Sequence, residues 1–335
     1  MTKIGAGKEH FTFSELDDEM IADAWYMVTE YHLNLGPRDN LEQIVKYIHE
    51  TKKFSAATKR ERILEYLRNC TDKEVLRIKR VLIANVPYRL QAPFMPEFKG
   101  KAWDVSEKRL VEGINEQKRL MYYFVTFHGL QTEIRMEVDW LLYLQKNLEI
   151  IVGWIQFNLI QYLQRRNPSV PGTSDKLYPP QERNLAKVIK YWKKILELCP
   201  VYEIYDHQEL DGKALSIDHF VPWSYVAHDE FWNLHPTTKQ INSSKSNRLP
   251  DWERYFSPFA GQEYLSYQMI WRYEQIHDEF EKCAREHLNN WEIQSRLYRA
   301  GLTEQEFSGQ LKDVLLPVYE SARNCGFGNW VYANE

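Results

Sequence analysis

Cysteine is scarce in this sequence, and the few that occur are scattered. The 335-residue chain has four, with no Cys-x-x-Cys pair among them: Cys70, Cys199, Cys283 and Cys325. A disulfide framework or a zinc knuckle needs cysteines in closely spaced sets. The composition therefore argues against both, and it predicts reduced thiols of the kind found in cytoplasmic proteins.

Long apolar runs are also lacking. The first residues, MTKIGAGKEHF, contain no apolar segment of the kind that a secretory signal requires. The longest apolar run, Val138 to Leu163, is interrupted by two acidic residues and a lysine, which argues against a membrane span. Its apolar stripe at helical spacing instead predicts one long buried helix from about Glu137 to Gln164. Together these features predict a cytoplasmic protein that does not contact a membrane.

An overall excess of positive charge is absent, because the net charge is −4. The chain is therefore not expected to bind polyanions through its total charge. Residues 161–200 are an exception, with eight basic and three acidic residues. We predict a helix from Gln181 to Leu198 in this segment. One of its faces, at spacing i, i+4, i+7 and i+11, would hold Arg183, Lys187, Lys190 and Lys194. That face suits phosphate groups, although a merely solvated amphipathic helix has the same pattern.

The organisation of the chain follows from where helical periodicity stops. The stretch PSVPGTSDKLYPP, residues 168–180, is rich in Pro, Gly and Ser and marks the clearest boundary. From Asp251 onward there are 14 acidic and 8 basic residues, which disfavours DNA contact there. We expect three regions: a helical scaffold, specificity or partner-binding region at 1–175, a central module at 176–255, and a helical region at 256–335 that packs on the rest.

The central module contains the most unusual segment, SIDHFVPWSYVAHDEFWNLHPTTKQINSSKSNRLP at 216–250. Residues 201–205 and 214–217 are predicted to form two short strands joined by a turn. After an irregular loop, a short helix with a threonine near its start should follow. This arrangement would direct four polar side chains to one point: Asp218 and His219 at the end of the second strand, and Asn242 and Lys245 one turn apart on the helix.

These residue types suit phosphodiester hydrolysis, which needs a base for a water, a divalent metal ion and a nearby cation. His219 is the predicted general base, because a neutral imidazole can accept the proton. Asp218 and Asn242 would offer oxygen ligands, which suit Mg²⁺ or Mn²⁺ better than zinc. Lys245 is expected to contact a phosphate oxygen. Asn233 is expected to tie the loop through backbone hydrogen bonds and to orient His219.

This pattern resembles the HNH, or ββα-metal, endonuclease family in Asp218-His219, Pro222, Asn233, Asn242 and Lys245. The gaps of 15, nine and three residues that separate Asp218, Asn233, Asn242 and Lys245 are similar to those in the HNH domain of the RNA-guided CRISPR nucleases. The KSNRLP ending, which contains Arg248, is similar too. The resemblance implies a ββα-metal module. Together with the helical periodicity of the flanking regions, this predicts an α+β fold that is predominantly helical with that module embedded in it. The resemblance also implies one catalytic divalent ion held by Asp218 and Asn242, His219 as the base, and Asn233 as the structural Asn.

The sequence departs from the family pattern in two ways. The third named position is often His, whereas here it is Asn242, so the choice between Mg²⁺ and Mn²⁺ stays open. The four-cysteine zinc frame of some relatives is absent, so the surrounding helices must brace the module. The resemblance covers residues 201–250, and the RuvC-like partner domain of the RNA-guided enzymes has no counterpart. Guide-directed cleavage is therefore not implied.

We therefore expect a metal-dependent HNH endonuclease that cleaves double-stranded DNA, in restriction or anti-phage defence. Arg183, Lys187, Lys190, Lys194 and Arg248 are the candidate nucleic-acid contacts. An RNA- or damage-processing nuclease with the same site is one alternative. A non-catalytic nucleic-acid- or partner-binding subunit with a degenerate module is another. A homodimer with twofold symmetry would supply a second site for the second strand. An activating protein partner is also left open.

Four polar residues near the motif are expected to have no direct role. His228 and His235 have the chemistry of metal ligands, but we interpret them as polar residues of the loop. A further metal carboxylate could come from Asp229 or Glu230. We expect both of these acids to be solvated at the start of a helix.

Overall fold

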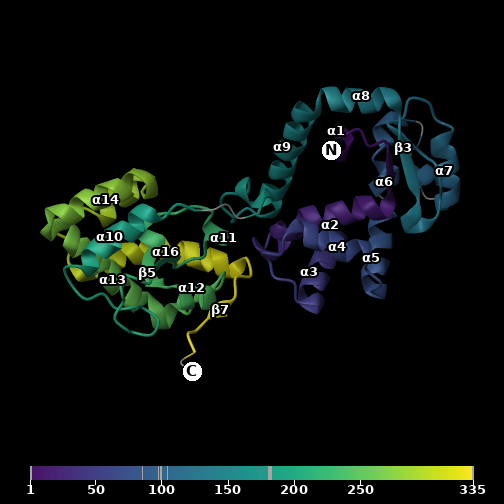
Figure 1. The fold of residues 1–335 in the computed structure, drawn as a ribbon. Helices are drawn as coiled ribbons and strands as arrows, with labels where there is room; N and C mark the ends of the chain where they lie inside the picture. The colour runs from purple at the N-terminus through teal and green to yellow at the C-terminus, as the bar shows by residue number, and fades with distance from the viewer. Residues whose placement is uncertain are drawn as a thin grey trace. The chain divides into compact units, whose positions relative to one another are not determined.

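The structure is a computed structural model, and it describes residues 2–84, 86–96, 98, 100–103, 105–179 and 183–333. The chain forms two compact units, Met1–Pro168 and Ser169–Glu335 (Figure 1). The division falls at the start of the Pro/Gly/Ser-rich stretch. Residues 176–255 and 256–335 therefore lie in the same unit. None of the helices in the described part of the chain combines the length and hydrophobicity needed to cross a membrane.

The N-terminal unit is built mainly on α2, which packs against three following helices. The Thr12 hydroxyl caps α2 by accepting a hydrogen bond from the Glu15 N–H, at 3.2 Å. A buried ion pair of 2.7 Å between Lys79 and Asp18 joins α5 to α2. The helices of this part are α1 (Thr2–Gly5), α2 (Phe13–Thr29), α3 (Asn40–Lys52), α4 (Arg60–Arg68), α5 (Lys73–Ile83), α6 (Val86–Arg89) and α7 (Glu107–Asn115), with 3₁₀ turns η1 (Ala92–Phe94) and η2 (Gly100–Trp103).

A small antiparallel sheet completes the core of this unit. Its strands are β1 (His10–Thr12), β2 (Tyr122–Phe124) and β3 (Glu133–Met136), in the order β1-β3-β2, with the 3₁₀ turn η3 (Gly129–Gln131) before β3. Phe13, Tyr88 and Phe124 pack together beneath the sheet, with Tyr88 stacked on Phe124 at 5.3 Å between ring centroids. The sheet thus joins the start of the chain to residues 122–136.

The predicted single helix over 137–164 is two helices, α8 (Val138–Lys146) and α9 (Leu148–Arg166), interrupted at Asn147. The prediction that this stretch is buried was wrong for most of α9. Leu163 is buried, whereas Ile150 and Trp154 expose 75% and 67% of their surface. Apolar residues occur on all sides of α9, so the sequence pattern could not identify which of them face a core.

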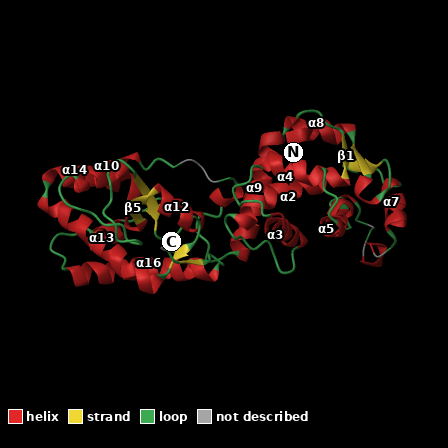
Figure 2. Ribbon diagram, turned by 60° about the horizontal axis from the view of Figure 1, so that its bottom comes forward, coloured by secondary structure: helices red, strands yellow, loops and turns green. Residues whose placement is uncertain are grey.

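The C-terminal unit is also mostly helical, with its strands confined to two small sheets (Figure 2). Helix α14 packs against α10 and α13, and α13 packs against α16. The elements in chain order are η4 (Asp175–Leu177), α10 (Ala186–Leu196), β4 (Leu215–His219), α11 (Trp223–Val226), η5 (Phe231–Asn233), β5 (Leu234–Thr238), α12 (Lys239–Lys245), β6 (Leu249–Pro250), α13 (Trp252–Arg272), α14 (Glu274–His287), α15 (Trp291–Leu297), α16 (Glu304–Asn324) and β7 (Asn329–Trp330).

Strand β4 pairs with β5 in an antiparallel ladder and not, as we predicted, with residues 201–205. That segment forms an isolated bridge between Tyr202 and Glu209. The carboxylate of Glu203 accepts hydrogen bonds from the N–H groups of Tyr205 and Asp206, at 2.5 and 3.1 Å. Those two bonds close a turn where the strand was expected. The observed order is therefore strand β4, strand β5 and helix α12.

Candidate active site

Two strands and a helix bring the predicted polar residues together. Asp218 and His219 are the last two residues of β4, opposite His235 and Leu234 of β5. Helix α12 packs against both strands. Its N-cap is Thr238, whose hydroxyl accepts a hydrogen bond from the Ile241 N–H at 3.3 Å. Asn242 and Lys245, three residues apart on α12, both contact β4.

Asp218 is held by two basic side chains. Its Oδ2 lies 3.0 Å from Lys245 Nζ and 3.7 Å from His235 Nε2. Burial by itself would raise the pKa of Asp218, but Lys245 and His235 outweigh it and hold that pKa below its ordinary value. Asp218 therefore presents an ionised carboxylate at the end of β4.

Lys245 does not reach outward as the predicted phosphate contact requires. Its side chain is fully buried, and its ammonium donates a hydrogen bond of 2.7 Å to the backbone oxygen of His219. Burial lowers the pKa of Lys245, and Asp218 offsets part of that effect. In this structure Lys245 fixes the end of β4, because both of its partners lie there.

Asn242 is oriented by strand β4. Its Nδ2 donates hydrogen bonds to Ser216 Oγ and to the backbone oxygen of Ile217, both at 3.1 Å. With the amide nitrogen committed to these acceptors, the side chain has its Oδ1 left to offer to an ion. Asn242 is partly exposed.

His219 is almost completely buried, with 2% of its surface exposed, and both of its ring nitrogens have partners. Nε2 lies 2.8 Å from Asp229 Oδ1, and Nδ1 lies 3.1 Å from a guanidinium nitrogen of Arg183. Burial lowers the pKa of His219, the hydrogen bond with Asp229 opposes this, and the charge of Arg183 adds to it. The net pKa lies below the ordinary value, which favours the neutral imidazole that a general base needs.

Asn233 makes the backbone hydrogen bonds that we predicted. Its Oδ1 accepts from the Val221 N–H at 2.8 Å, and its Nδ2 donates to the Val221 oxygen at 2.9 Å. Its own backbone oxygen accepts from the Phe220 N–H at 2.9 Å. These bonds fix the two residues that directly follow His219. An orienting effect on His219 itself stays a prediction.

The five basic candidates do not form one surface of α10. The helix begins at Ala186, and the predicted start at Gln181 lies outside the described residues. Arg183 precedes the helix and stacks over the Trp223 ring, at 5.4 Å. Lys187 forms an ion pair with Glu286, and Lys190 forms one of 2.9 Å with Glu279, so α14 neutralises part of the predicted face. Lys194 is partly exposed on the same helix, and Arg248 is bonded to the backbone oxygens of Ser244 and Lys245.

Three of the four residues expected to have no direct role were misjudged. His235 is not in the loop: it is a buried residue of β5, beside Asp218 and 3.3 Å from the Tyr205 hydroxyl. Glu230 is buried rather than solvated, and it accepts a hydrogen bond of 3.1 Å from Asn289. Asp229 faces His219. A carboxylate ten residues after a histidine is common in loops, so the sequence held no specific signal for this contact.

The donor set fits a single divalent cation. Among the described residues there is no cluster of three or more His, Cys, Asp or Glu side chains that could hold a metal ion by themselves. The carboxylate of Asp218 and the amide oxygen of Asn242 are hard oxygen donors on neighbouring elements. Such a pair leaves coordination positions for water and phosphate, which is how Mg²⁺ and Mn²⁺ are commonly bound.

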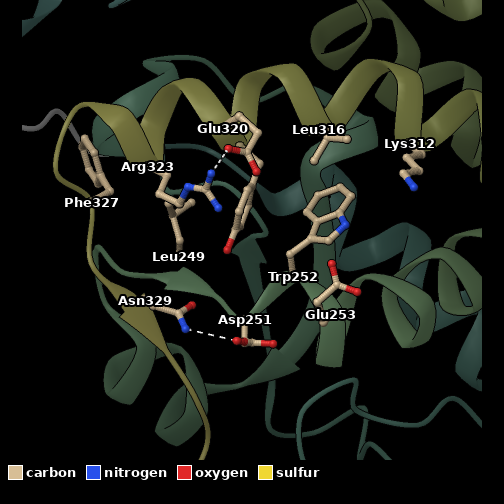
Figure 3. Close-up of a pocket in the computed structure, with 11 residues that line it drawn as sticks. Leu249, Asp251, Trp252, Glu253, Lys312, Leu316, Glu320, Arg323, Phe327 and Asn329 are labelled. Atoms are coloured by element: carbon tan, nitrogen blue, oxygen red, sulfur yellow. Dashed lines mark hydrogen bonds and ion pairs between the residues drawn. The ribbon is translucent and has the colours of Figure 1, made fainter.

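A separate cavity of about 450 Å³ lies beside the start of α13 (Figure 3). Trp252 and Tyr319 are among the aromatic residues that line it, and the pairs Arg323–Glu320 and Asn329–Asp251 are among its polar residues. None of the predicted site residues lines it. The cavity is therefore distinct from the cluster around Asp218 and His219.

Residues 203–251 match the protein-family model described as HNH endonuclease. The match contains the whole cluster on β4, β5 and α12, so this segment is an HNH-family domain, as the motif predicted. Membership of this family implies nuclease activity on nucleic acid, and HNH nucleases generally use a divalent metal ion. No curated protein and no solved structure matches the chain.

Proposed function

We propose that the protein is a metal-dependent endonuclease that hydrolyses phosphodiester bonds in double-stranded DNA. The observation that supports this most is the arrangement around β4. The buried imidazole of His219, the ionised carboxylate of Asp218 and the amide of Asn242 converge there from one strand and one helix. The HNH-family match to residues 203–251 supports the same reaction class.

In the proposed reaction His219 takes a proton from the attacking water. The nitrogen available for this is Nδ1, since Nε2 is bonded to Asp229. Asp218 and Asn242 would hold one Mg²⁺ or Mn²⁺ ion, which supplies charge neutralisation at the phosphate and the leaving oxygen. Lys245 and His235 keep Asp218 ionised and in place, so the ligand is ready before the ion binds.

Arg183 is the proposed contact for the scissile phosphate. Its exposed side chain donates to Nδ1 of His219, at 3.1 Å. A phosphate that receives a water activated at Nδ1 must lie on the same side of the ring. Guanidinium groups bind phosphate through paired hydrogen bonds, so the diester would draw Arg183 away from Nδ1 and leave that nitrogen free for water.

The direct test is cleavage of supercoiled plasmid with Mg²⁺ or Mn²⁺. Wild-type protein should nick the DNA, whereas His219→Ala and Asn242→Ala should bind it with little change and lose about 10²-fold or more in rate. A wild type that binds DNA but nicks it with neither ion, including in a lysate that supplies partners, would refute the catalytic proposal. That result would support a degenerate, binding-only module.

The same assay separates the remaining alternatives. Single-stranded DNA, duplex RNA and damaged duplexes at equal concentration would show whether an RNA- or damage-processing role fits better. A role in restriction or anti-phage defence inside the cell predicts that phage plating rises when His219→Ala replaces the wild type. Sedimentation with and without DNA would show whether two copies assemble to cut both strands.

A further inference from the structure

We propose that Asp229 is a positioning residue that fixes the ring of His219 and selects the tautomer whose Nδ1 serves as the base. This inference rests on the proposed function, because it concerns the same histidine. The inference goes beyond the proposed function by giving a role to a carboxylate that the family motif does not include.

The tautomer follows from the two partners of the ring. A guanidinium has only donor hydrogens, so Nδ1 must accept the hydrogen bond from Arg183, at 3.1 Å. A neutral imidazole has one N–H, which must then lie on Nε2. Nε2 therefore donates to Asp229 Oδ1, at 2.8 Å. Once a phosphate draws Arg183 away from Nδ1, Asp229 is the partner that keeps the proton on Nε2. Without Asp229, either nitrogen of the substrate-bound enzyme could carry the proton, and a proton on Nδ1 would remove the lone pair that serves as the base.

The backbone at Asp229 is held by the last residue of α14. The backbone oxygen of Asp229 accepts a hydrogen bond of 2.9 Å from His287 Nδ1. The neighbouring Glu230 accepts one of 3.1 Å from Asn289. Two residues earlier, Ala227 adopts the left-handed conformation, with φ of 57°, so the chain bends just before this segment. The loop is thus anchored at Asp229 and at the residue that follows it.

Asp229 is suited to the charge that develops on His219 during the reaction. Burial alone would raise the pKa of Asp229, but the bond with His219 and nearby positive charges outweigh it, so the side chain is ionised. When Nδ1 takes the proton, the water O–H bond breaks and the water oxygen forms a new bond to phosphorus. The bond to the departing nucleotide oxygen breaks, and that oxygen takes a proton from solvent. The resulting imidazolium keeps its Nε2–H on the carboxylate, which stabilises it.

The kinetic test compares two neutralised carboxylates of the C-terminal unit, one at His219 and one away from it. Asp229→Asn can turn its NH₂ toward Nε2 and so favour the wrong tautomer. We expect about a 10²-fold lower kcat for plasmid nicking with Mg²⁺, with KM for DNA unchanged. Glu209→Gln, at an exposed position of the same unit, removes one charge without touching the loop that contains Asp229 and should stay within twofold of wild type. Equal kcat values for the two variants would overturn the proposal.

A spectroscopic test reads the tautomer without any cleavage. The measurement is an NMR spectrum of protein that contains ¹⁵N-labelled histidine, recorded with Mg²⁺ present. The signals of His219 are identified as those that disappear in His219→Gln. We expect a protonated Nε2 and an unprotonated Nδ1 in the wild type and in Arg183→Ala, and a shift toward protonated Nδ1 when Asp229→Asn is added to Arg183→Ala, which removes the other partner of the ring. A wild type with the proton on Nδ1 would overturn the inference. If the spectrum agrees but the wild type cuts no nucleic acid, the proposed function fails while the Asp229 contact stands.

Discussion

The ammonium of Lys245 lies 3.0 Å from the carboxylate of Asp218, and both side chains are almost completely buried. A buried charge is tolerable only when it is paired, because water no longer solvates it. The same ammonium donates to the backbone oxygen of His219. One lysine therefore stabilises the predicted metal ligand and fixes the backbone of the proposed base.

Replacing Lys245 should damage both stability and activity. Lys245→Met leaves the buried carboxylate of Asp218 with His235 as its remaining basic neighbour. Because a buried charge without its partner is costly, we expect a loss of about 3–5 kcal/mol in the free energy of unfolding. Urea denaturation at neutral pH would measure it. Lys239→Met, at an exposed position of the same helix, is the matched control and should change stability by less than about 0.5 kcal/mol. Similar losses for the two variants would contradict the assigned role of the pair.

The lysines of α10 should differ in their contribution to DNA binding. Lys187 is ion-paired with Glu286, whereas Lys194 makes no ion pair with an acidic side chain of the described residues. Lys194→Gln should therefore reduce the slope of log binding constant against log salt concentration by about 0.9, and Lys187→Gln should reduce it by less. Fluorescence anisotropy over a range of salt concentrations would give both slopes. An unchanged slope for Lys194→Gln would remove α10 from the DNA path.

Lys176 gives the C-terminal unit a distinctive dependence on pH. Its side chain is fully buried and donates to the backbone oxygen of Tyr225, and burial lowers its pKa to about 7. A lysine in the unfolded chain titrates near pH 10.4, about as free lysine does. Between about pH 7 and pH 10 the unfolded state thus binds more protons, so the contribution of Lys176 to stability rises with pH over that window.

Substitution of Lys176 tests this directly. Lys176→Met should be more stable than the wild type at about pH 7, and the difference should shrink as the pH rises toward about 10. Denaturation curves at several pH values would show it. For Lys213→Met, at an exposed position, the plot of unfolding free energy against pH should run parallel to that of the wild type. If the plot for Lys176→Met is also parallel to that of the wild type, burial does not lower the pKa of Lys176 as described.

Exposed and buried residues of α9 should respond differently to truncation. Trp154→Ala removes a side chain that is 67% exposed and should cost the N-terminal unit little stability in the monomer. Leu163→Ala, at a position with 0% exposure on the same helix, should cost about 2–5 kcal/mol. Thermal unfolding of both variants at low protein concentration would distinguish them. A large cost for Trp154→Ala would mean that another surface covers α9.

The central cluster could be predicted from sequence because its geometry is local. Asn242 and Lys245 are three residues apart on a helix, so they share a face, and Asp218 and His219 are adjacent at a strand end. The spacing between these positions also carries the family resemblance, which the HNH match to 203–251 confirms. Short-range spacing was therefore enough for the motif and for the general type of fold around it.

The predictions that were wrong concern contacts between segments that are far apart in the sequence. Asp229 contacts His219 from a loop whose backbone is hydrogen-bonded to His287, at the end of the distant helix α14. Lys245 was expected to face a phosphate, and whether a lysine points inward depends on how α12 packs on β4. The prediction that α9 is buried was wrong for a related reason. An apolar sequence pattern does not show whether another surface is present to cover the helix.

The contacts of His219 extend beyond the segment by which the family is recognised. Arg183 precedes the match at 203–251, and His287 follows it. A fragment cut to 203–251 would keep the whole motif and lose the guanidinium that faces the base as well as the anchor of its carboxylate partner. The boundaries of the family match are therefore narrower than the boundaries of the arrangement around His219, and a minimal fragment for biochemical work should run from before Arg183 to beyond His287.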